Sequence, residues 1–217
     1  MKENFTDISI VLDRSGSMGS IKDDTIGGFN QFIEDQQKVE GKALLSLIQF
    51  DSEYSIVHSA IPIKETPKLT DKTFIPRAST ALYDAIGRTI LATGIRLNGI
   101  DESDRPDKVI FVIITDGYEN ASREFDGNTI KQMIEHQTKI YNWEFVYLGA
   151  NQDAITVAND MGIGRGQTLS YAATSRGTKS AFASISKGMT MKRTFKGLDG
   201  QNMNYFNQDD RDAQDEV

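Results

Sequence analysis

The chain has 217 residues, which suits one ordinary domain, and its 38% hydrophobic share leaves room for a polar, exposed segment. A net charge of −7 argues against binding to nucleic acid, which needs a basic surface. The sequence contains no cysteine, so disulfides, thiol catalysis and cysteine-based zinc sites are excluded. A polar N-terminus and the lack of any long apolar run predict no secretory signal, no membrane span and a cytoplasmic location.

The apolar residues predict an alternation of strands and helices. Nearly continuous apolar runs indicate strands covered on both faces, and apolar spacings of three and four indicate helices. The expected strands, in chain order, cover residues 6–13, 43–50, 54–60, 109–114, 144–148 and 167–171. The expected helices cover residues 21–37, 82–97, 128–140, 153–161 and 174–189. Only residues 51–53 join the second and third strands, so we expect this pair to be antiparallel. Gly27 and Gly28 are expected to let the first helix approach the sheet closely.

Two regions depart from this alternation. Residues 61–79 carry three of the four prolines and predict a long surface loop, which in compact domains is often functional. Residues 209–217 contain five acidic side chains and a single basic one, which is typical of a flexible or partner-ordered tail. We therefore expect one domain over residues 1–190 and a polar acidic tail over residues 191–217.

Carboxylate and hydroxyl side chains follow the first strand. Asp13, Ser15 and Ser17 are spaced two apart where the strand runs into a turn, and Gly16 lets that turn fold tightly. Three hard oxygens that face one point suit a small hard cation such as Mg²⁺. The same five residues are also typical of a helix N-cap, in which these oxygens accept hydrogen bonds from backbone N–H groups. The pentapeptide leaves both interpretations open.

Two further polar residues are expected at the same edge of the sheet. Asp116 follows the most apolar strand of the sequence, and Thr80 precedes a helix after the long loop. Ligands gather at the carboxyl ends of parallel strands, where the chain order changes direction, so Asp13 and Asp116 are expected to share a site. Thr80, taken by itself, is more typical of a cap for the helix that follows it.

Together these features indicate a doubly wound α/β domain with a mostly parallel central sheet, one antiparallel edge hairpin strand and helices on both faces. In three places the sequence resembles the von Willebrand factor type A domains, which include the integrin inserted domains. Residues 13–17 (DRSGS) are similar to the family's DxSxS, residues 80–86 to the segment that opens with its metal-site threonine, and residues 114–117 to its TDG. The similarity in strand order and spacing extends over about residues 5–190, and it implies the Rossmann-like fold of that family.

The resemblance implies a metal-ion-dependent adhesion site. Its members in this sequence would be Asp13, Ser15, Ser17, Thr80 and Asp116. In the family the serines and sometimes the threonine bind the ion directly, whereas the aspartates often act through water. Two carboxylates would balance the charge of Mg²⁺ or Mn²⁺, and neutral hydroxyls would leave the ion electrophilic toward a further carboxylate. The expected partner is a protein that supplies an Asp or Glu side chain to the metal.

Three neighbouring carboxylates are given no ligand role. Asp84 could hydrogen-bond the loops of the site, but a helix-surface or capping role is favoured. Glu119 and Asp51 are expected to be solvated charges at the rim of the sheet.

The sequence favours a non-catalytic, cation-dependent protein-binding module over two alternatives. One is a structural or assembly subunit of a phage or bacterial complex, in which the metal only stabilises the loops. The other is a metal-dependent phosphatase, which needs a second carboxylate two residues after the first, where this chain has Ser15. The identity of the partner, the oligomeric state and the choice between Mg²⁺ and Mn²⁺ are left undetermined.

Overall fold

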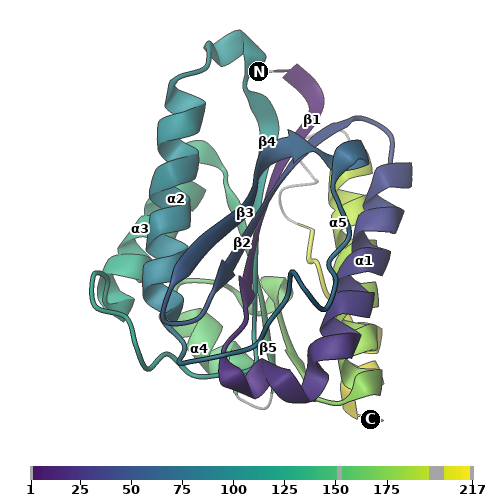
Figure 1. Ribbon diagram of the computed structural model, residues 1–217. Helices are drawn as coiled ribbons and strands as arrows, with labels where there is room; N and C mark the ends of the chain where they lie inside the picture. The colour runs from purple at the N-terminus through teal and green to yellow at the C-terminus, as the bar shows by residue number, and fades with distance from the viewer. Residues whose placement is uncertain (1, 151–152, 196–202, 216–217) are drawn as a thin grey trace.

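A six-stranded sheet forms the centre of the molecule (Figure 1). The computed structural model describes residues 2–150, 153–195 and 203–215. The strand order is β3-β2-β1-β4-β5-β6, and every neighbouring pair is parallel except β2 with β3. The strands are β1 (Lys2–Asp13), β2 (Lys42–Phe50), β3 (Tyr54–Pro62), β4 (Pro106–Thr115), β5 (Glu144–Ala150) and β6 (Thr168–Tyr171). The predicted sheet, mostly parallel with one antiparallel edge strand, is confirmed.

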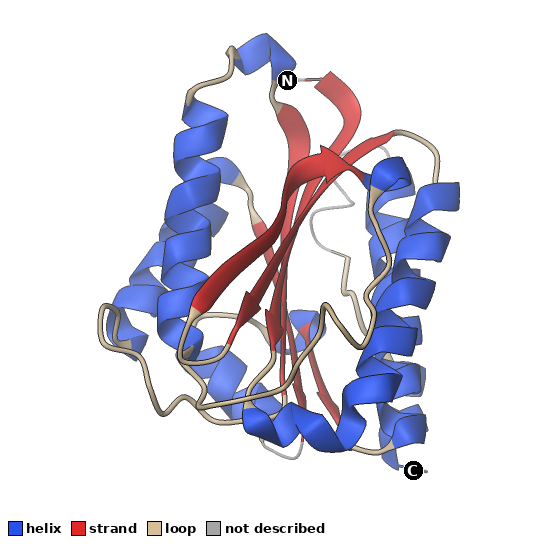
Figure 2. Ribbon diagram, viewed as in Figure 1, coloured by secondary structure: helices blue, strands red, loops and turns tan. Residues whose placement is uncertain are grey.

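Helices cover both faces of this sheet, as Figure 2 shows. One face carries α1 (Lys22–Lys38) and α5 (Ser175–Thr194), and the other carries α2 (Leu82–Asn98), α3 (Gly127–Tyr141) and α4 (Ala154–Asp160). A last helix, α6 (Gln208–Asp215), contacts α5 and β6. Short 3-10 helices are η1 (Gly16–Ile21), η2 (Ile63–Glu65), η3 (Glu102–Asp104) and η4 (Arg165–Gln167).

The core has two halves, one on each face of the sheet. Along β1, Ile10 and Leu12 pack toward α1 and α5, whereas Val11 packs toward α2. Because β1 and β4 lie in the middle of the sheet and are covered on both faces, both of their side-chain rows are apolar. This explains why these two strands are nearly continuous hydrophobic runs in the sequence.

Close packing of α1 against α5 depends on Gly28. An ideal Cβ placed on Gly28 would lie 2.3 Å from a ring carbon of Phe182 in α5, whereas a Cβ on Gly27 would meet nothing within 4 Å. The expectation that these glycines serve the approach of the helix to the sheet is therefore wrong. Gly28 makes room for the neighbouring helix, and the sequence pattern could not tell which partner the helix would face.

The C-terminal segment, for which the sequence predicted a flexible or partner-ordered tail, packs against the domain in its described part. Helix α5 continues to Thr194, and in residues 203–215 the side chains of Tyr205 and Phe206 are only 3% and 2% exposed. The backbone N–H of Tyr205 donates to the carbonyl oxygen of Gly166 over 2.9 Å. Two aromatic side chains thus anchor a segment whose polar composition had suggested exposure.

The topology places a crevice between β1 and β4. From β1 the chain adds β2 and β3 on one side, and from β4 it adds β5 and β6 on the other. Such a switch in chain order leaves a gap above the carboxyl ends of the two strands, where α/β proteins bind their ligands. Asp13 and Thr115 are the last residues of these strands, so both lie at that edge.

Candidate metal centre

Three loops meet at the carboxyl edge of β1 and β4. The N–H of Gly16, in the loop after β1, donates to the carbonyl oxygen of Ala78 over 3.1 Å. The loop before α2 is joined in turn to the loop after β4, because the N–H of Asn120 donates to the carbonyl oxygen of Thr80 over 3.0 Å. Asn120 also accepts a hydrogen bond from the N–H of Thr80 through its side-chain Oδ1, at 2.9 Å. The three loops that carry the predicted site residues are thus held together by two hydrogen bonds between backbones and one to the Asn120 side chain.

Four of the five expected site residues form a continuous series of contacts. Asp13 Oδ1 accepts a hydrogen bond from the N–H of Ser15 over 2.6 Å, and the Oγ atoms of Ser15 and Ser17 are 3.1 Å apart. Ser17 Oγ donates to Oδ1 of Asp116 over 2.6 Å. The first loop and the loop after β4 therefore contribute to one cluster of oxygen atoms.

The backbone of Gly117 locates the fifth residue. A Cβ on Gly117 would lie 3.1 Å from Thr80 Oγ1, 3.6 Å from Ser17 Oγ and 3.9 Å from Asp13 Oδ2. Three oxygens from two segments thus lie around the backbone of Gly117 in the third loop, in a small space that a larger side chain at position 117 would fill. The structure brings all five residues together, and their role as metal ligands stays a prediction.

The capping alternative applies to Asp13, whose Oδ1 accepts the N–H of Ser15, but not to the hydroxyls of Ser15 and Thr80. Ser15 occupies the N-cap position of η1 but makes no side-chain capping hydrogen bond. Helix α2 has Ala81 at its N-cap position, so Thr80 does not cap it. Both hydroxyls therefore remain free of the competing role that the sequence had left open.

The electrostatics of the two aspartates suit a cation. Burial raises the pKa of Asp13 to about 6, against the hydrogen bonds from Thr115 and Ser15 that lower it, and the charge of Asp116 adds to the rise. Burial also raises the pKa of Asp116. Because a raised carboxyl pKa means that the charged form is poorly compensated, a divalent cation would supply what the protein does not.

The chemistry of the donors fits a hard metal ion. Two carboxylates and three hydroxyls are the oxygen ligands that Mg²⁺ and Mn²⁺ prefer. Within the part of the chain that the structure describes, no three or more His, Cys, Asp or Glu side chains gather in a group that could hold a metal. A metal at this edge would therefore depend on the hydroxyls of the loops as well as on the aspartates.

Asp51 is buried, and its expected role as a solvated charge is wrong. Its side chain is 0% exposed, and its Oδ2 accepts hydrogen bonds from Nε of Arg14 and Nε of Arg77, each over 2.9 Å. Its Oδ1 accepts the N–H of Glu53 over 2.6 Å. Asp51 thus links the loop after β1, the β2–β3 turn and the loop before α2.

Glu119 is also hydrogen-bonded, so its expected role as a solvated charge is wrong. Its carboxylate accepts the N–H groups of Tyr83, Ala121 and Ser122 at 3.0, 2.8 and 2.7 Å. These bonds fold the loop after β4 onto the first turn of α2. In the sequence, only the closeness of Glu119 to residues 121 and 122 could have indicated this role.

The expectation that favoured a helix-surface or capping role for Asp84 is also wrong. Its carboxylate accepts three backbone N–H groups of the loop after β4, those of Arg123, Glu124 and Phe125, at 2.9, 2.9 and 3.0 Å. It therefore orders a loop of the site, which was the less favoured possibility. Nothing in the sequence showed that residues 123–125 would lie over α2.

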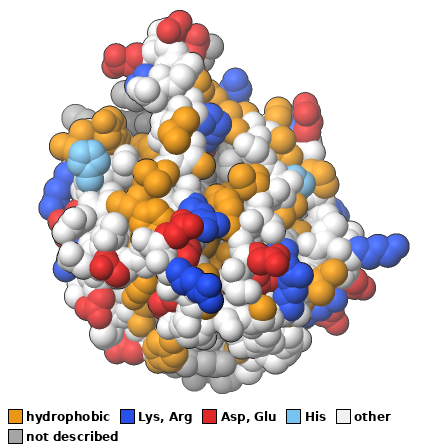
Figure 3. All heavy atoms as spheres, turned by 60° about the vertical axis from the view of Figure 1, so that its left-hand side comes forward, with side chains coloured by type: hydrophobic (Ala, Val, Ile, Leu, Met, Phe, Trp, Pro, Cys, Tyr) orange, Lys and Arg blue, Asp and Glu red, His pale blue; other side chains and the backbone are white. Residues whose placement is uncertain are grey.

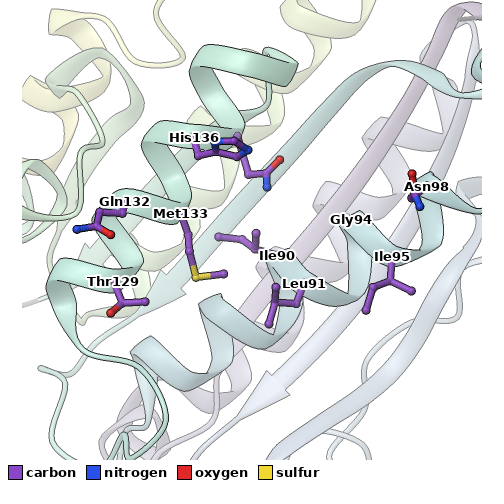
Figure 4. Close-up of a pocket in the computed structure, with 10 residues that line it drawn as sticks. Ile90, Leu91, Gly94, Ile95, Asn98, Thr129, Gln132, Met133 and His136 are labelled. Atoms are coloured by element: carbon purple, nitrogen blue, oxygen red, sulfur yellow. The ribbon is translucent and has the colours of Figure 1, made fainter.

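A separate groove lies between α2 and α3 and contains none of the five site residues. It has a volume of about 620 Å³, and Figure 4 shows Ile90, Leu91, Ile95 and Met133 along it. The view in Figure 3, which brings this side of the molecule forward, shows hydrophobic side chains gathered there. Among the described residues, nothing identifies an occupant of this groove.

The arrangement of strands, helices and edge site defines the class as a doubly wound α/β protein. The chain matches no family model and no curated protein. Solved structures do match it.

The vWF domain of the type V pili tip protein Mfa5 from Porphyromonas gingivalis matches with a TM-score of 0.61 at 9% identity, over 91% of this chain and 99% of that one. Proximal thread matrix protein 1 from the mussel byssus, with a zinc-occupied MIDAS motif, matches with a TM-score of 0.60 at 12% identity, over 88% and 47%. The manganese-loaded TRAP protein of Plasmodium vivax matches with a TM-score of 0.54 at 16% identity, over 78% and 69%. This chain spans about half the length of the mussel protein. The fold is that of the von Willebrand factor type A domains.

One observation bears on the prediction that no segment of the chain spans a membrane. Among the residues that the structure describes, no helix is long and apolar enough to cross a bilayer. The cytoplasmic location stays a prediction.

Proposed function

We propose that this chain is a non-catalytic module that binds a protein partner through a divalent cation, Mg²⁺ or Mn²⁺. The observation that carries the proposal is the hydrogen bond of 2.6 Å from Ser17 Oγ to Asp116 Oδ1. It joins the DxSxS loop to the TDG loop, so that hydroxyl and carboxylate oxygens from distant segments face one point.

Each residue of the site has a distinct part in this proposal. Asp13 and Asp116 supply the negative charge that balances a divalent cation. The remaining members, Ser15, Ser17 and Thr80, supply neutral oxygens. The bound cation would attract the carboxylate of an Asp or Glu side chain of the partner, because the neutral ligands leave its charge uncancelled.

The similar structures support the coarse form of the proposal. One is described with a zinc-occupied MIDAS motif, another is manganese-loaded, and a third is a domain of a pilus tip protein. At their low identity they argue for the fold, and the transfer of metal-dependent binding to this chain is our inference. The phosphatase alternative is disfavoured by the chain itself, because position 15 holds a serine where a phosphatase of this type needs its second carboxylate.

Calorimetric titration of the chain with MgCl₂ and MnCl₂ tests the metal, and affinity capture from the native host with and without EDTA tests the partner. We expect the wild type to bind at least one cation and to release its partner in EDTA. Asp13→Ala should bind neither cation nor partner, whereas the exposed Asp71→Ala should behave as the wild type. A flat titration of the wild type would contradict the proposal, as would capture of the same protein by Asp13→Ala in EDTA.

A further inference from the structure

The hydroxyl group of Tyr171 is an unexplained polar group close to the site. Tyr171 is the last residue of β6 and is 4% exposed. Its hydroxyl oxygen is buried and has no hydrogen-bond partner among the described residues. Burying a hydroxyl without a hydrogen bond is costly, so most such groups in proteins pair with another polar group or with an internal water.

The register of the sheet places Tyr171 level with Asp116. Tyr171 pairs with Ala150 of β5, and Gly149 pairs with Thr115 of β4. Asp116 follows Thr115 directly, so Asp116, Ala150 and Tyr171 stand in one row across three strands. Neighbouring strands lie about 4.8 Å apart, so two strand spacings separate the Asp116 backbone from that of Tyr171.

Tyr171 lies on the face of the sheet that leads to Asp116. It packs in the half of the core beside α1 and α5, as does Ile114, and Asp116 stands two residues beyond Ile114, directly after the end of β4. The residue between them in the row is Ala150, which is buried in the same half of the core. Burial raises the pKa of Tyr171, and the charges of Asp116 and Asp13 raise it further, so the hydroxyl lies within electrostatic reach of both carboxylates.

Two more buried hydroxyls without a partner lie at the same end of the helix pair. Thr25 and Thr178 are the fourth residues of α1 and α5, and each hydroxyl oxygen is buried without a hydrogen-bond partner among the described residues. One turn further along, Gly28 and Phe182 are in contact, which places the two threonines at the beginning of the α1–α5 interface. Several unpaired hydroxyls in one part of a core are typical of a site for internal water, which makes two to four hydrogen bonds to such groups.

We propose that Tyr171 is a positioning residue of the metal centre, whose hydroxyl acts on the carboxylate of Asp116 through an internal water. The tyrosine donates to the water, and the water donates to Asp116, which keeps the carboxylate turned toward the hydroxyls of Ser17 and Thr80. This inference rests on the proposed function. It adds to the site a residue of the edge strand β6, outside the three loops.

Tyr171→Phe removes the hydroxyl and keeps the ring, and Tyr205→Phe is the matched control. Tyr205 is also buried and on the same side of the sheet, but it packs beside Lys192 near the end of α5. We expect Tyr171→Phe to weaken Mn²⁺ binding about 10-fold in calorimetry, since partners of metal ligands typically contribute that much. In EDTA its urea unfolding midpoint should stay close to that of the wild type, because the ring and its packing are kept. Tyr205→Phe should bind Mn²⁺ as the wild type does.

Three results would overturn the inference, and they separate it from the proposed function. Equal Mn²⁺ affinity of Tyr171→Phe and the wild type would overturn the inference and leave the metal site standing. Equal weakening by Tyr171→Phe and Tyr205→Phe would show a general effect of the core and would also overturn it. A wild type that binds no cation would overturn the proposed function and the inference together. An ordered water between Tyr171 and Asp116 in a crystal structure of the Mn²⁺-loaded protein would support the inference directly.

Discussion

Thr115 donates its hydroxyl proton to Oδ2 of Asp13 over 2.6 Å, which ties the last residue of β4 to the last residue of β1. The same hydroxyl oxygen accepts the N–H of Gly117 over 3.2 Å. One side chain therefore orients a carboxylate of the candidate site and the first turn of the TDG loop. Because Thr115 ends a buried strand, its position is determined by the sheet.

Thr115→Val is expected to weaken the binding of Mn²⁺ about 10-fold, because the variant leaves Asp13 free to rotate away from the site. Valine has nearly the shape of threonine, so the core should keep its packing. Calorimetric titration measures the effect, and Thr93→Val, a buried threonine of α2 outside the site, is the control. Unchanged affinity in Thr115→Val would show that Asp13 does not need this hydrogen bond.

Asp51→Asn is expected to lower the free energy of unfolding by about 3 kcal/mol, since it leaves the charge of Arg14 without its buried partner. The pair with Arg77 contributes less, because the Arg77 side chain is 51% exposed to solvent. Urea denaturation measures the change. Glu53→Gln alters a side chain that is 67% exposed and should change stability by less than about 0.5 kcal/mol. Equal effects of the two substitutions would contradict the role of Asp51 in linking the three loops.

Two adjacent glycines of α1 should respond in opposite directions to alanine. Gly28→Ala places a methyl group 2.3 Å from the ring of Phe182 and should destabilise the protein by about 1 to 3 kcal/mol. Gly27→Ala meets no atom within 4 Å and should stabilise it by about 0.5 to 1 kcal/mol, because alanine favours helix over glycine. Thermal or urea unfolding of both variants measures these changes in the free energy of unfolding. A stabilising Gly28→Ala would mean that α1 and α5 do not pack this closely in solution.

The contribution of Asp84 to stability should depend on pH. Burial alone would raise its pKa, but the three backbone N–H groups of residues 123–125 outweigh burial and hold the pKa below the ordinary value of 3.8. A carboxyl group whose pKa is lower in the folded than in the unfolded protein stabilises the fold at any pH above its unfolded-state pKa. That stabilisation is lost as the pH falls through its folded-state pKa. Asp84→Asn should therefore be less stable than the wild type at pH 7, by about 1 to 3 kcal/mol, and the difference should shrink below about pH 4.

Urea unfolding between pH 3 and pH 7 follows this difference. Asp71→Asn, at an exposed position, controls for the change in net charge and should give a small difference that varies little. A gap between the wild type and Asp84→Asn that is as large at pH 3 as at pH 7 would show that the ionised carboxylate is not what orders the loop.

Local pattern was enough to predict the six strands, helices α1 to α5 and the loop of the first three site residues, but it missed α6. The run of apolar residues in β4 is short and rich in Val and Ile, which favours a strand covered on both faces. Asp13, Ser15 and Ser17 lie in one short turn, so their closeness follows from the chain itself. The antiparallel pairing of β3 with β2 followed likewise from the three residues that join them.

Packing between distant segments decided the rest. That Asp51 is enclosed by Arg14 and Arg77, and that Tyr171 stands in a row with Asp116, depends on which strands neighbour each other and in what register. A segment's composition reports how it prefers to interact with water, and this is a property of its own residues. Which surface it finally meets is a property of the whole fold, because the contact energy depends on partners that lie far away along the chain.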